Sequence, residues 1–332
     1  MKKLFACTLA LAMLLVSLVA LAADEPVAIA IGVYNHPVHR IVELGFLKAA
    51  QELGYTDARV IGTEGDDWSL VYAACNDFAA EGGKGIMLWA GDETAFPTLS
   101  RMAAEDVAVG IAHFKFVKED GTLPEGLTFN MACDPVLYGQ QSAEIMAKKL
   151  DGKTGSVAIT LNTKNITENA ADDSFRAEWE ALGATYDLSK IKLLETQLEG
   201  GVMDAATAVN LAIIQANPDI IGAFGTTGNS PITWSEAATK AGKADGEIAI
   251  IGMDATEGNL DALESGKVLA LVAQPLYQEA YKTMEYLDKV FKGEEVPLWT
   301  PLEAPIVTAD GEGENGIQFH RDIAAQVETF FK

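Results

Sequence analysis

Residues 248–273 read IAIIGMDATEGNLDALESGKVLALVA and contain two short apolar runs, Ile248–Met253 and Val268–Ala273. Neither run alternates between apolar and polar residues, which is typical of strands that a parallel sheet buries on both faces. A helix is expected from Glu257, between the two runs. A strand, a helix and a second strand in this order predict an α/β fold built on a parallel sheet.

The same alternation extends over most of the chain, where β-rich runs in two sets of five are separated by helical patterns. The runs are Val27–Gly32, Arg59–Gly62, Gly85–Trp89, Val107–Ala112 and Leu127–Ala132, then Ser156–Leu161, Ile191–Thr196, Ile220–Gly225, Ile248–Met253 and Val268–Ala273. The clearest helical patterns are Val38–Leu53, Leu70–Glu81, Val136–Leu150, Ala171–Leu182 and Ala205–Ala216. The sets resemble each other, since VAVGIAHF (107–114) matches IAIIGMDA (248–255). We therefore expect two similar doubly wound, Rossmann-like lobes with a cleft between them, at the carboxyl ends of both sheets.

Length and charge narrow the classes of partner. The chain has 332 residues, about two domains of ordinary size, and its 49% apolar content is sufficient for two cores. Its 48 acidic residues exceed its 24 Lys and Arg, which gives a net charge of −24. Nucleic acids and anionic membranes bind through Lys and Arg, so this charge excludes them as partners of the simple electrostatic kind.

The first 22 residues have the three parts of a signal peptide. Lys2 and Lys3 precede the apolar run 4–21, and Ala20-Leu21-Ala22 offers the small residues that a signal peptidase requires. The alternative, a membrane anchor, is disfavoured because small residues close the run and an acidic segment follows. Cys7 lies too early to be a lipidation site. We predict an exported, periplasmic protein that is cleaved near Ala22 and is not a lipoprotein.

Two cysteines, Cys75 and Cys133, remain after this processing. An oxidising compartment would permit a disulfide between them. Cys75 lies in a helical pattern and Cys133 just after a strand, which favours two buried free thiols. The chain has no CxxC motif and no Cys/His spacing of the kind that binds zinc.

Aromatic and short polar side chains follow nearly every predicted strand, at the end where open α/β sheets bind ligands. The candidate binding residues are His36, His39, Trp89, His113, Phe114, Asn169, Thr227, Asn229, Asp254 and Gln274. Carboxylates and amides bind hydroxyl groups, and aromatic rings pack on the C–H face of a sugar. The combination predicts a cleft for a sugar or polyol.

Each candidate also has a purely structural explanation. Trp89 and Phe114 could belong to the core, where aromatic residues usually lie. Asp254 could cap the helix from Glu257, and Gln274 could be an ordinary turn residue before Pro275. Their joint position at strand ends favours the ligand site.

His36, His39 and His113 would suit a transition metal if Asp254 completed the site. His36 and His39 flank Pro37 and follow no known ligand spacing. Hydrogen bonding or stacking with an organic ligand is the favoured interpretation, and we expect no metal.

No signature of catalysis or of cofactor binding is convincing. Residues 311–316 match G-x-G-x-x-G, but they neither follow a strand nor open a long helix, and Glu312 and Glu314 would repel a pyrophosphate. The chain has no G-x-S-x-G, Walker A or H-E-x-x-H motif. We therefore expect a binding protein without enzymatic activity and without a cofactor.

Taken together, IAIIGMDATEGNLDALESGKVLALVAQPLYQEAYKTMEYLDKVFKGEEV (248–296) and ANPDIIGAFGTTGNSP (216–231) resemble the ribose/galactose-type periplasmic solute-binding proteins of ABC importers, which have the type I fold. The resemblance covers residues 27–332. It implies that Asp254 and Gln274 bind sugar hydroxyls and that Thr227 replaces a pocket asparagine. It also places Trp89 at a polar pocket position, and His36 and His39 where relatives have an asparagine and stacking aromatics.

Two departures from that family bear on the ligand. Ribose-binding relatives have an Asp-Arg pair where this chain has His113-Phe114, and their helix-opening arginine has no counterpart near Asn169. A plain pentopyranose is therefore less expected than a polyol, a modified sugar or a less polar ligand.

The resemblance also implies a domain plan and a set of partners. We expect an N-terminal lobe of residues 23–133 and 275–303 and a C-terminal lobe of residues 134–274 and 304–332. A three-crossing hinge near Cys133–Pro135, Gln274–Pro275 and Leu302–Pro305 would join them. A monomer would close on its ligand and deliver it to a membrane permease. The alternative is that the protein presents a sugar or furanone-type signal to a chemoreceptor or sensor. A metal-binding or repressor-like protein is less favoured; a repressor would need a basic helix-turn-helix, which this sequence does not offer.

Overall fold

The computed structural model describes residues 25–34, 37–65, 67–89, 93–118, 120–164 and 166–332. The predicted signal peptide and His36 lie outside these ranges. Contacts divide the chain into a first unit, made of Met1–Cys133, Leu276–Leu302 and Thr329–Lys332, and a second unit, made of Asp134–Pro275 and Glu303–Glu328. The chain thus passes from one unit to the other after Cys133, Pro275, Leu302 and Glu328.

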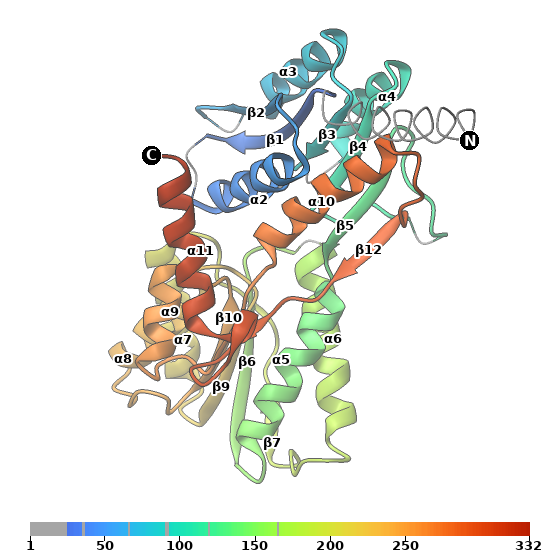
Figure 1. Cartoon of the computed structure of the whole chain (residues 1–332). Helices are drawn as coiled ribbons and strands as arrows, with labels where there is room; N and C mark the ends of the chain where they lie inside the picture. The colour runs from blue at the N-terminus through green and yellow to red at the C-terminus, as the bar shows by residue number, and fades with distance from the viewer. Residues whose placement is uncertain (1–24, 35–36, 66, 90–92, 119, 165) are drawn as a thin grey trace, which may run out of the picture. The chain divides into compact units, whose positions relative to one another are not determined.

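A parallel sheet with the strand order β12-β5-β4-β3-β1-β2 forms the centre of the first unit (Figure 1). Its strands are β1 (Val27–Val33), β2 (Ala58–Thr63), β3 (Gly85–Leu88), β4 (Ala108–Ala112), β5 (Phe129–Cys133) and β12 (Trp299–Leu302). The helices are α2 (Pro37–Leu53), α3 (Trp68–Ala80), α4 (Phe96–Ala104) and α10 (Leu276–Phe291), with the short η1 (Glu93–Ala95) before α4.

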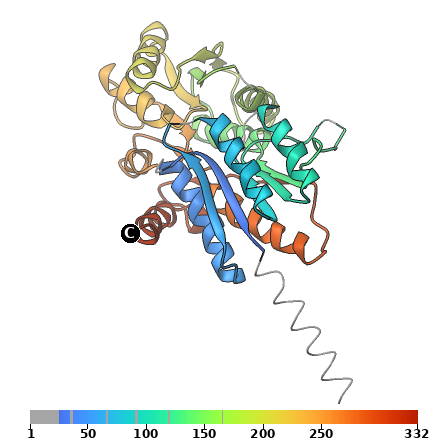
Figure 2. The ribbon, with the colours of Figure 1, turned by 90° about the horizontal axis from the view of Figure 1, so that it is seen from above.

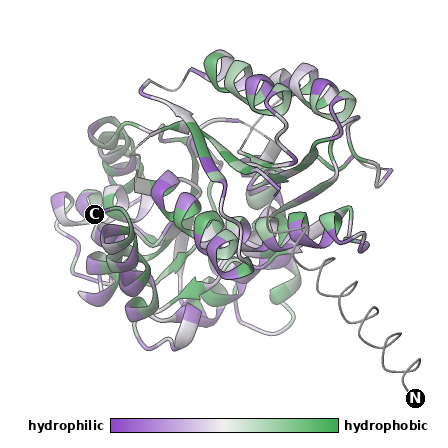
Figure 3. Ribbon diagram, turned by 45° about the horizontal axis from the view of Figure 1, so that its top comes forward, coloured by the Kyte–Doolittle hydropathy of each residue, from purple (hydrophilic) through white to green (hydrophobic). Residues whose placement is uncertain are grey.

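Hydrophobic cores cover both faces of this sheet. Val27, Ile29 and Ile31 of β1 pack with α2 and α10, whereas Ala28 and Ala30 pack with α3 and α4 on the other face (Figure 2). Successive strand side chains point to opposite faces, so a strand between two cores needs apolar residues at every position. This burial explains the apolar runs in the sequence. The helices, which have one side in solvent, mix hydrophobic and hydrophilic residues (Figure 3).

The second unit repeats this arrangement with the strand order β13-β11-β10-β9-β6-β7, and β8 also pairs with β6. The strands are β6 (Gly155–Leu161), β7 (Ile191–Leu193), β8 (Gln197–Leu198), β9 (Ile220–Gly225), β10 (Ala249–Met253), β11 (Ala270–Val272) and β13 (Ile306–Val307). β13 is antiparallel to β11. The helices are α5 (Pro135–Leu150), α6 (Ile166–Leu182), α7 (Met203–Ala216), α8 (Ser230–Lys240), α9 (Glu257–Glu264) and α11 (Ile317–Phe330). The residues of α11 up to Glu328 belong to this unit, and the short η2 (Gly313–Asn315) precedes this helix.

The predicted fold class, α/β with two doubly wound parallel sheets, is confirmed. One predicted strand, Ile191–Thr196, is shorter in the structure: β7 ends at Leu193, and β8 begins at Gln197, just after the predicted range. In the segment between β7 and β8, Arg176 of α6 donates from Nη2 to the carbonyl of Leu194 at 2.9 Å and to Thr196 Oγ1 at 2.7 Å. None of the helices in the described ranges combines the length and the apolar composition needed to span a bilayer.

Candidate ligand-binding site

One backbone feature recurs at the end of the corresponding strand in both units. His113 follows β4 with φ of 79°, and Asp254 follows β10 with φ of 66°. The N–H of His113 donates to Met131 O at 3.1 Å, and that of Asp254 donates to Val272 O at 2.8 Å. Besides these two, Asp106 is the only non-glycine residue with positive φ in the described part of the chain. Left-handed backbone at a non-glycine residue costs on the order of 1–3 kcal/mol and is concentrated at functional sites.

In the first unit, four candidate residues form an aromatic cluster, which consists of His39, Trp89, His113 and Phe114. The Trp89 ring stacks on His113 with the centroids 4.4 Å apart and the planes at 27°. The Phe114 ring meets the His113 ring edge to face, with the centroids 4.6 Å apart. The ring centroids of His39 and Trp89 are 5.6 Å apart. Four predicted site residues, from α2 and from the ends of β3 and β4, are thus brought together at the carboxyl end of this sheet.

Trp89 belongs to the core as well as to this cluster, since only 5% of its surface is exposed. One face of its indole is covered by His113. His39 is fixed to the backbone, because its Nδ1 lies 2.9 Å from Val33 O.

Glu279, on the first turn of α10, holds His113 from the side of the core. Its Oε2 lies 3.3 Å from His113 Nδ1, and its Oε1 accepts the N–H of Cys133 at 3.1 Å. The side chain is completely buried. The sequence reasoning missed Glu279, and no local signal identifies it, because it is 166 residues from His113.

In the second unit, the Asp254 turn is tied to the loop after β9. Asn259 is fully buried, and its Nδ2 lies 2.8 Å from Gly228 O, 3.1 Å from Met253 O and 2.9 Å from Asp254 O. The position of α9 excludes the capping role for Asp254, because the residue at the N-cap is Thr256. The Asp254 carboxylate also lies against Gly228, where a Cβ atom would meet its Oδ2.

Thr227, which follows β9, lies beside a second buried carboxylate that the sequence reasoning missed. Glu199 is 3% exposed and accepts bonds from Ser230 Oγ, from Asn210 Nδ2 at 2.7 Å and from Thr227 Oγ1 at 3.4 Å. Burial raises the pKa of the Glu199 carboxyl, and the hydrogen bonds from Ser230 and Asn210 offset part of that effect. Asn229 in the same loop donates from Nδ2 to Gly201 O at 2.9 Å. Hydrogen bonds to Glu199 and to Gly201 O therefore fix the loop that carries Thr227 and Asn229.

The remaining candidates are less closely integrated. Gln274 is half-buried and follows β11 in the chain. Asn169 is exposed on α6, which begins at Ile166 and not at the predicted Ala171. Its neighbour Glu168 makes the inward contacts, accepting Asn162 N–H at 2.6 Å and Thr226 Oγ1–H at 2.7 Å.

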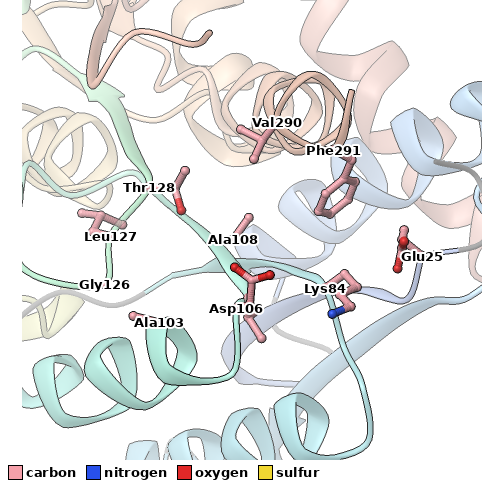
Figure 4. A pocket seen from close by; sticks show the side chains of 11 residues that line it. Glu25, Lys84, Ala103, Asp106, Ala108, Gly126, Leu127, Thr128, Val290 and Phe291 are labelled. Carbon is pink, nitrogen blue, oxygen red and sulfur yellow. The ribbon is translucent and has the colours of Figure 1, made fainter. Parts of the chain in front are cut away.

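Two hollows in the surface contain none of the predicted site residues. The larger, about 570 Å³, lies at the amino ends of the strands of the first unit, where Glu25, Lys84 and Asp106 approach Phe291 of α10 (Figure 4). The smaller, about 380 Å³, lies beside β13 in the second unit and includes Glu144 and Glu303. Open α/β sheets bind ligands at the opposite, carboxyl ends of their strands.

Two further properties concern metals and thiols. Within the described ranges, no three His, Cys, Asp or Glu side chains are close enough to hold a metal ion. Cys75 and Cys133 are both buried and not disulfide-bonded, as the sequence predicts. Burial raises the pKa of the Cys75 thiol to about 12.

Comparisons with known proteins agree with this architecture. Residues 27–295 match the family profile described as a periplasmic binding protein domain. The ribose import binding protein RbsB of Salmonella typhimurium is 25% identical over 286 residues, which cover 86% of this chain and 91% of that protein. The protein of the same name from Haemophilus influenzae is 24% identical over 310 residues, which are 93% of this chain and all of that one.

Solved structures share the fold at low sequence identity. The sugar-binding protein of a Bacillus halodurans sugar ABC transporter superposes with a TM-score of 0.75 at 20% identity, over 86% of this chain and 98% of that one. The arabinose-binding protein AraP of Geobacillus stearothermophilus gives a TM-score of 0.74 at 18% identity, over 86% and 97%.

Proposed function

Because the chain belongs to the periplasmic binding protein family, we propose that it is the exported sugar-binding component of an ABC-type importer. Its ligand would be a monosaccharide, a polyol or a related small neutral molecule, which it delivers to a membrane permease. The curated relatives, named as ribose import binding proteins, support import over the alternative of sensory presentation.

One observation carries this proposal: the same strand end in each unit presents a left-handed residue with a hydrogen-bonding side chain, His113 in one and Asp254 in the other. The aromatic cluster surrounds the first of these, and the Thr227 loop lies beside the second. Sugars require this mixture, because their hydroxyls need directional hydrogen bonds and their C–H faces pack on aromatic rings.

We assign the following roles within the proposed site. Asp254 and Gln274 bind hydroxyls, Thr227 and Asn229 supply further polar contacts, and Phe114 offers an aromatic edge. A ligand that binds a closed form better than an open one would bias the protein toward the closed form, which the permease recognises. We propose a monomer without catalytic activity. A chemoreceptor would be a second partner that reads the same closed form.

The proposed location follows from the family and from the N-terminal sequence. Periplasmic binding proteins are exported, and residues 1–22 have the order of a signal peptide. We propose cleavage near Ala22. N-terminal sequencing of the protein secreted from its host tests this, and a start well away from residue 23 would contradict it.

A thermal-shift screen of the mature chain, residues 23–332, tests the ligand class. The panel includes D-ribose, D-arabinose, D-tagatose, D-fucose, D-galactose and several polyols, with amino acids and nucleosides as controls. A ligand at 100 times its Kd stabilises the folded protein by about 2.7 kcal/mol. We expect at least one sugar or polyol to raise the Tm. A shift by a control compound alone would overturn the proposal.

A further inference from the structure

Glu279 is a fully buried carboxylate whose two oxygens contact two different groups. Oε1 accepts the backbone N–H of Cys133 at 3.1 Å, and Oε2 faces His113 Nδ1 at 3.3 Å. Its own backbone carbonyl accepts Thr283 Oγ1–H, a bond within α10. No Lys or Arg pairs with it among the described residues. His113 is therefore its only titratable partner there.

The geometry around Glu279 assigns a hydrogen-bonding role to each of its carboxylate oxygens. Glu279 lies in the first turn of the 16-residue helix α10, where the helix dipole stabilises negative charge. The Cys133 N–H donates directly to Oε1, so this oxygen acts as an acceptor and Oε2 is the oxygen that faces His113. A carboxylate oxygen accepts hydrogen bonds, so the short contact of Oε2 with His113 assigns the donor role, and with it the proton, to Nδ1.

A neutral imidazole carries one proton, so a proton on Nδ1 leaves Nε2 as a hydrogen-bond acceptor. The ring orientation is fixed independently, because Trp89 stacks on one face of His113 and Phe114 meets it edge to face. The left-handed backbone at His113 and its N–H bond to Met131 O fix the base of the side chain. In the described part of the chain, Nε2 makes no hydrogen bond, and the side chain retains 15% exposure.

We propose that Glu279 is a positioning residue that fixes His113 in the Nδ1–H tautomer and so makes Nε2 an acceptor toward the ligand. As regards the ligand, this rests on the sugar-binding function proposed above. It specifies what the site requires at this point: a ligand group that donates a hydrogen bond, such as a hydroxyl. A ligand that offers only an acceptor there is disfavoured, because it would leave two acceptors facing each other.

The test uses Glu279→Gln, which keeps the shape and reverses the proton arrangement. The Cys133 N–H still needs an acceptor, so the amide oxygen of the new side chain takes the position of Oε1. The amide NH₂ then faces His113 Nδ1 and donates to it, which forces the proton of His113 onto Nε2. Glu43→Gln is the matched control, since Glu43 is also a buried glutamate of the first unit, at 3% exposure.

Nitrogen-15 NMR of histidine-labelled, ligand-free protein at about pH 8, where an ordinary imidazole is neutral, distinguishes the tautomers. The four histidines give few signals, and His113→Asn assigns the relevant pair. We expect Nδ1–H in the wild type and in E43Q, and Nε2–H in E279Q. An Nε2–H tautomer in the wild type would overturn the inference without any variant. An unchanged tautomer in folded E279Q would also overturn it.

Calorimetric titration with D-ribose, D-arabinose, D-tagatose and D-fucose adds the functional consequence. For a sugar of this set that binds the wild type, we expect E279Q to bind about 10-fold more weakly, equivalent to about 1.4 kcal/mol, and E43Q to bind equally well. If the wild type binds a sugar but carries the Nε2–H tautomer, the role of Glu279 is contradicted and the proposed function is not. The expected tautomer without binding of any sugar would contradict the proposed function and leave the role of Glu279 standing.

Discussion

Gly228→Ala is expected to weaken ligand binding by displacing the Asp254 carboxylate while leaving the chain's charge unchanged. A Cβ atom at position 228 would lie 3.3 Å from Asp254 Cγ and would approach its Oδ2 about 1 Å closer than van der Waals contact allows. The carboxylate is the flexible end of a side chain and can rotate away. Gly228 does not have positive φ, so alanine imposes no backbone strain there.

The magnitude follows from the hydrogen bonds that Asp254 is proposed to make. A hydrogen bond to a charged group contributes about 1.5–3 kcal/mol, and a displacement of about 1 Å is enough to lose its alignment. We therefore expect the Kd to rise about 10- to 150-fold. Asp254→Asn should have a similar effect without a large loss of stability, because asparagine tolerates the left-handed backbone at this position.

The assay is calorimetric titration of the mature chain with the sugar or polyol that the thermal-shift screen identifies. Gly65→Ala is the control, because nothing lies within 4 Å of a Cβ atom at that position. Thermal melts without ligand should place G228A close to the wild type. If G228A and D254N both bind with wild-type affinity, Asp254 does not contact the ligand and its assigned role is wrong.

Three further predictions concern buried groups. Ellman's reagent should label neither Cys75 nor Cys133 in the native protein and both after unfolding, since both are buried; rapid labelling of the native protein would contradict their burial. Burial raises the pKa of Glu199, so as the pH rises this carboxyl ionises at a lower pH in the unfolded chain than in the folded protein. The contribution of Glu199 to the free energy of unfolding therefore falls as the pH rises above the ordinary pKa of a glutamate. Urea melts at pH 4.5 and 7 should therefore show a smaller loss of stability in Glu199→Gln than in the wild type, and an equal loss in both would refute this. Asn259→Ala should lower the free energy of unfolding by about 2–3 kcal/mol, because three backbone carbonyls lose their donor; an unchanged denaturation midpoint would show that the donor is dispensable.

The fold was predictable because each central strand lies between two hydrophobic cores. β1 illustrates this: alternate side chains enter different cores, so the whole run is apolar and visible in the sequence. β12 and β13 escaped prediction. β12 contains Pro301, which reads as a break but is tolerated at a sheet edge, and β13 comprises only Ile306 and Val307.

The site was predictable in part, because ligand-binding positions in this architecture follow the strands. The match of VAVGIAHF with IAIIGMDA puts His113 and Asp254 in corresponding places, and the structure gives both the same left-handed backbone and the same type of hydrogen bond. Asn169 was assigned because it follows a predicted strand. The structure places it on α6, which begins five residues before the predicted start, and at that turn Glu168 makes the inward contacts.

The supporting carboxylates could not be predicted from the sequence. Glu279 lies in a helix among polar residues, where a glutamate normally faces solvent, and its burial depends on the packing of α10 on β4 and β5. Glu199 lies close in sequence to an exposed stretch that includes Val202, yet it forms the centre of a buried network with Asn210 and Ser230. Tertiary contacts determine the burial of both glutamates, and no local sequence pattern indicates it.

Calorimetric titration of residues 23–332 with the panel of monosaccharides and polyols tests the central claim most directly. We predict that at least one of these compounds binds one to one, and that Asp254→Asn and Glu279→Gln each weaken that binding. Saturable binding of an amino acid or a nucleoside, with no heat from any sugar or polyol, would contradict the assignment of this protein as a sugar-binding component.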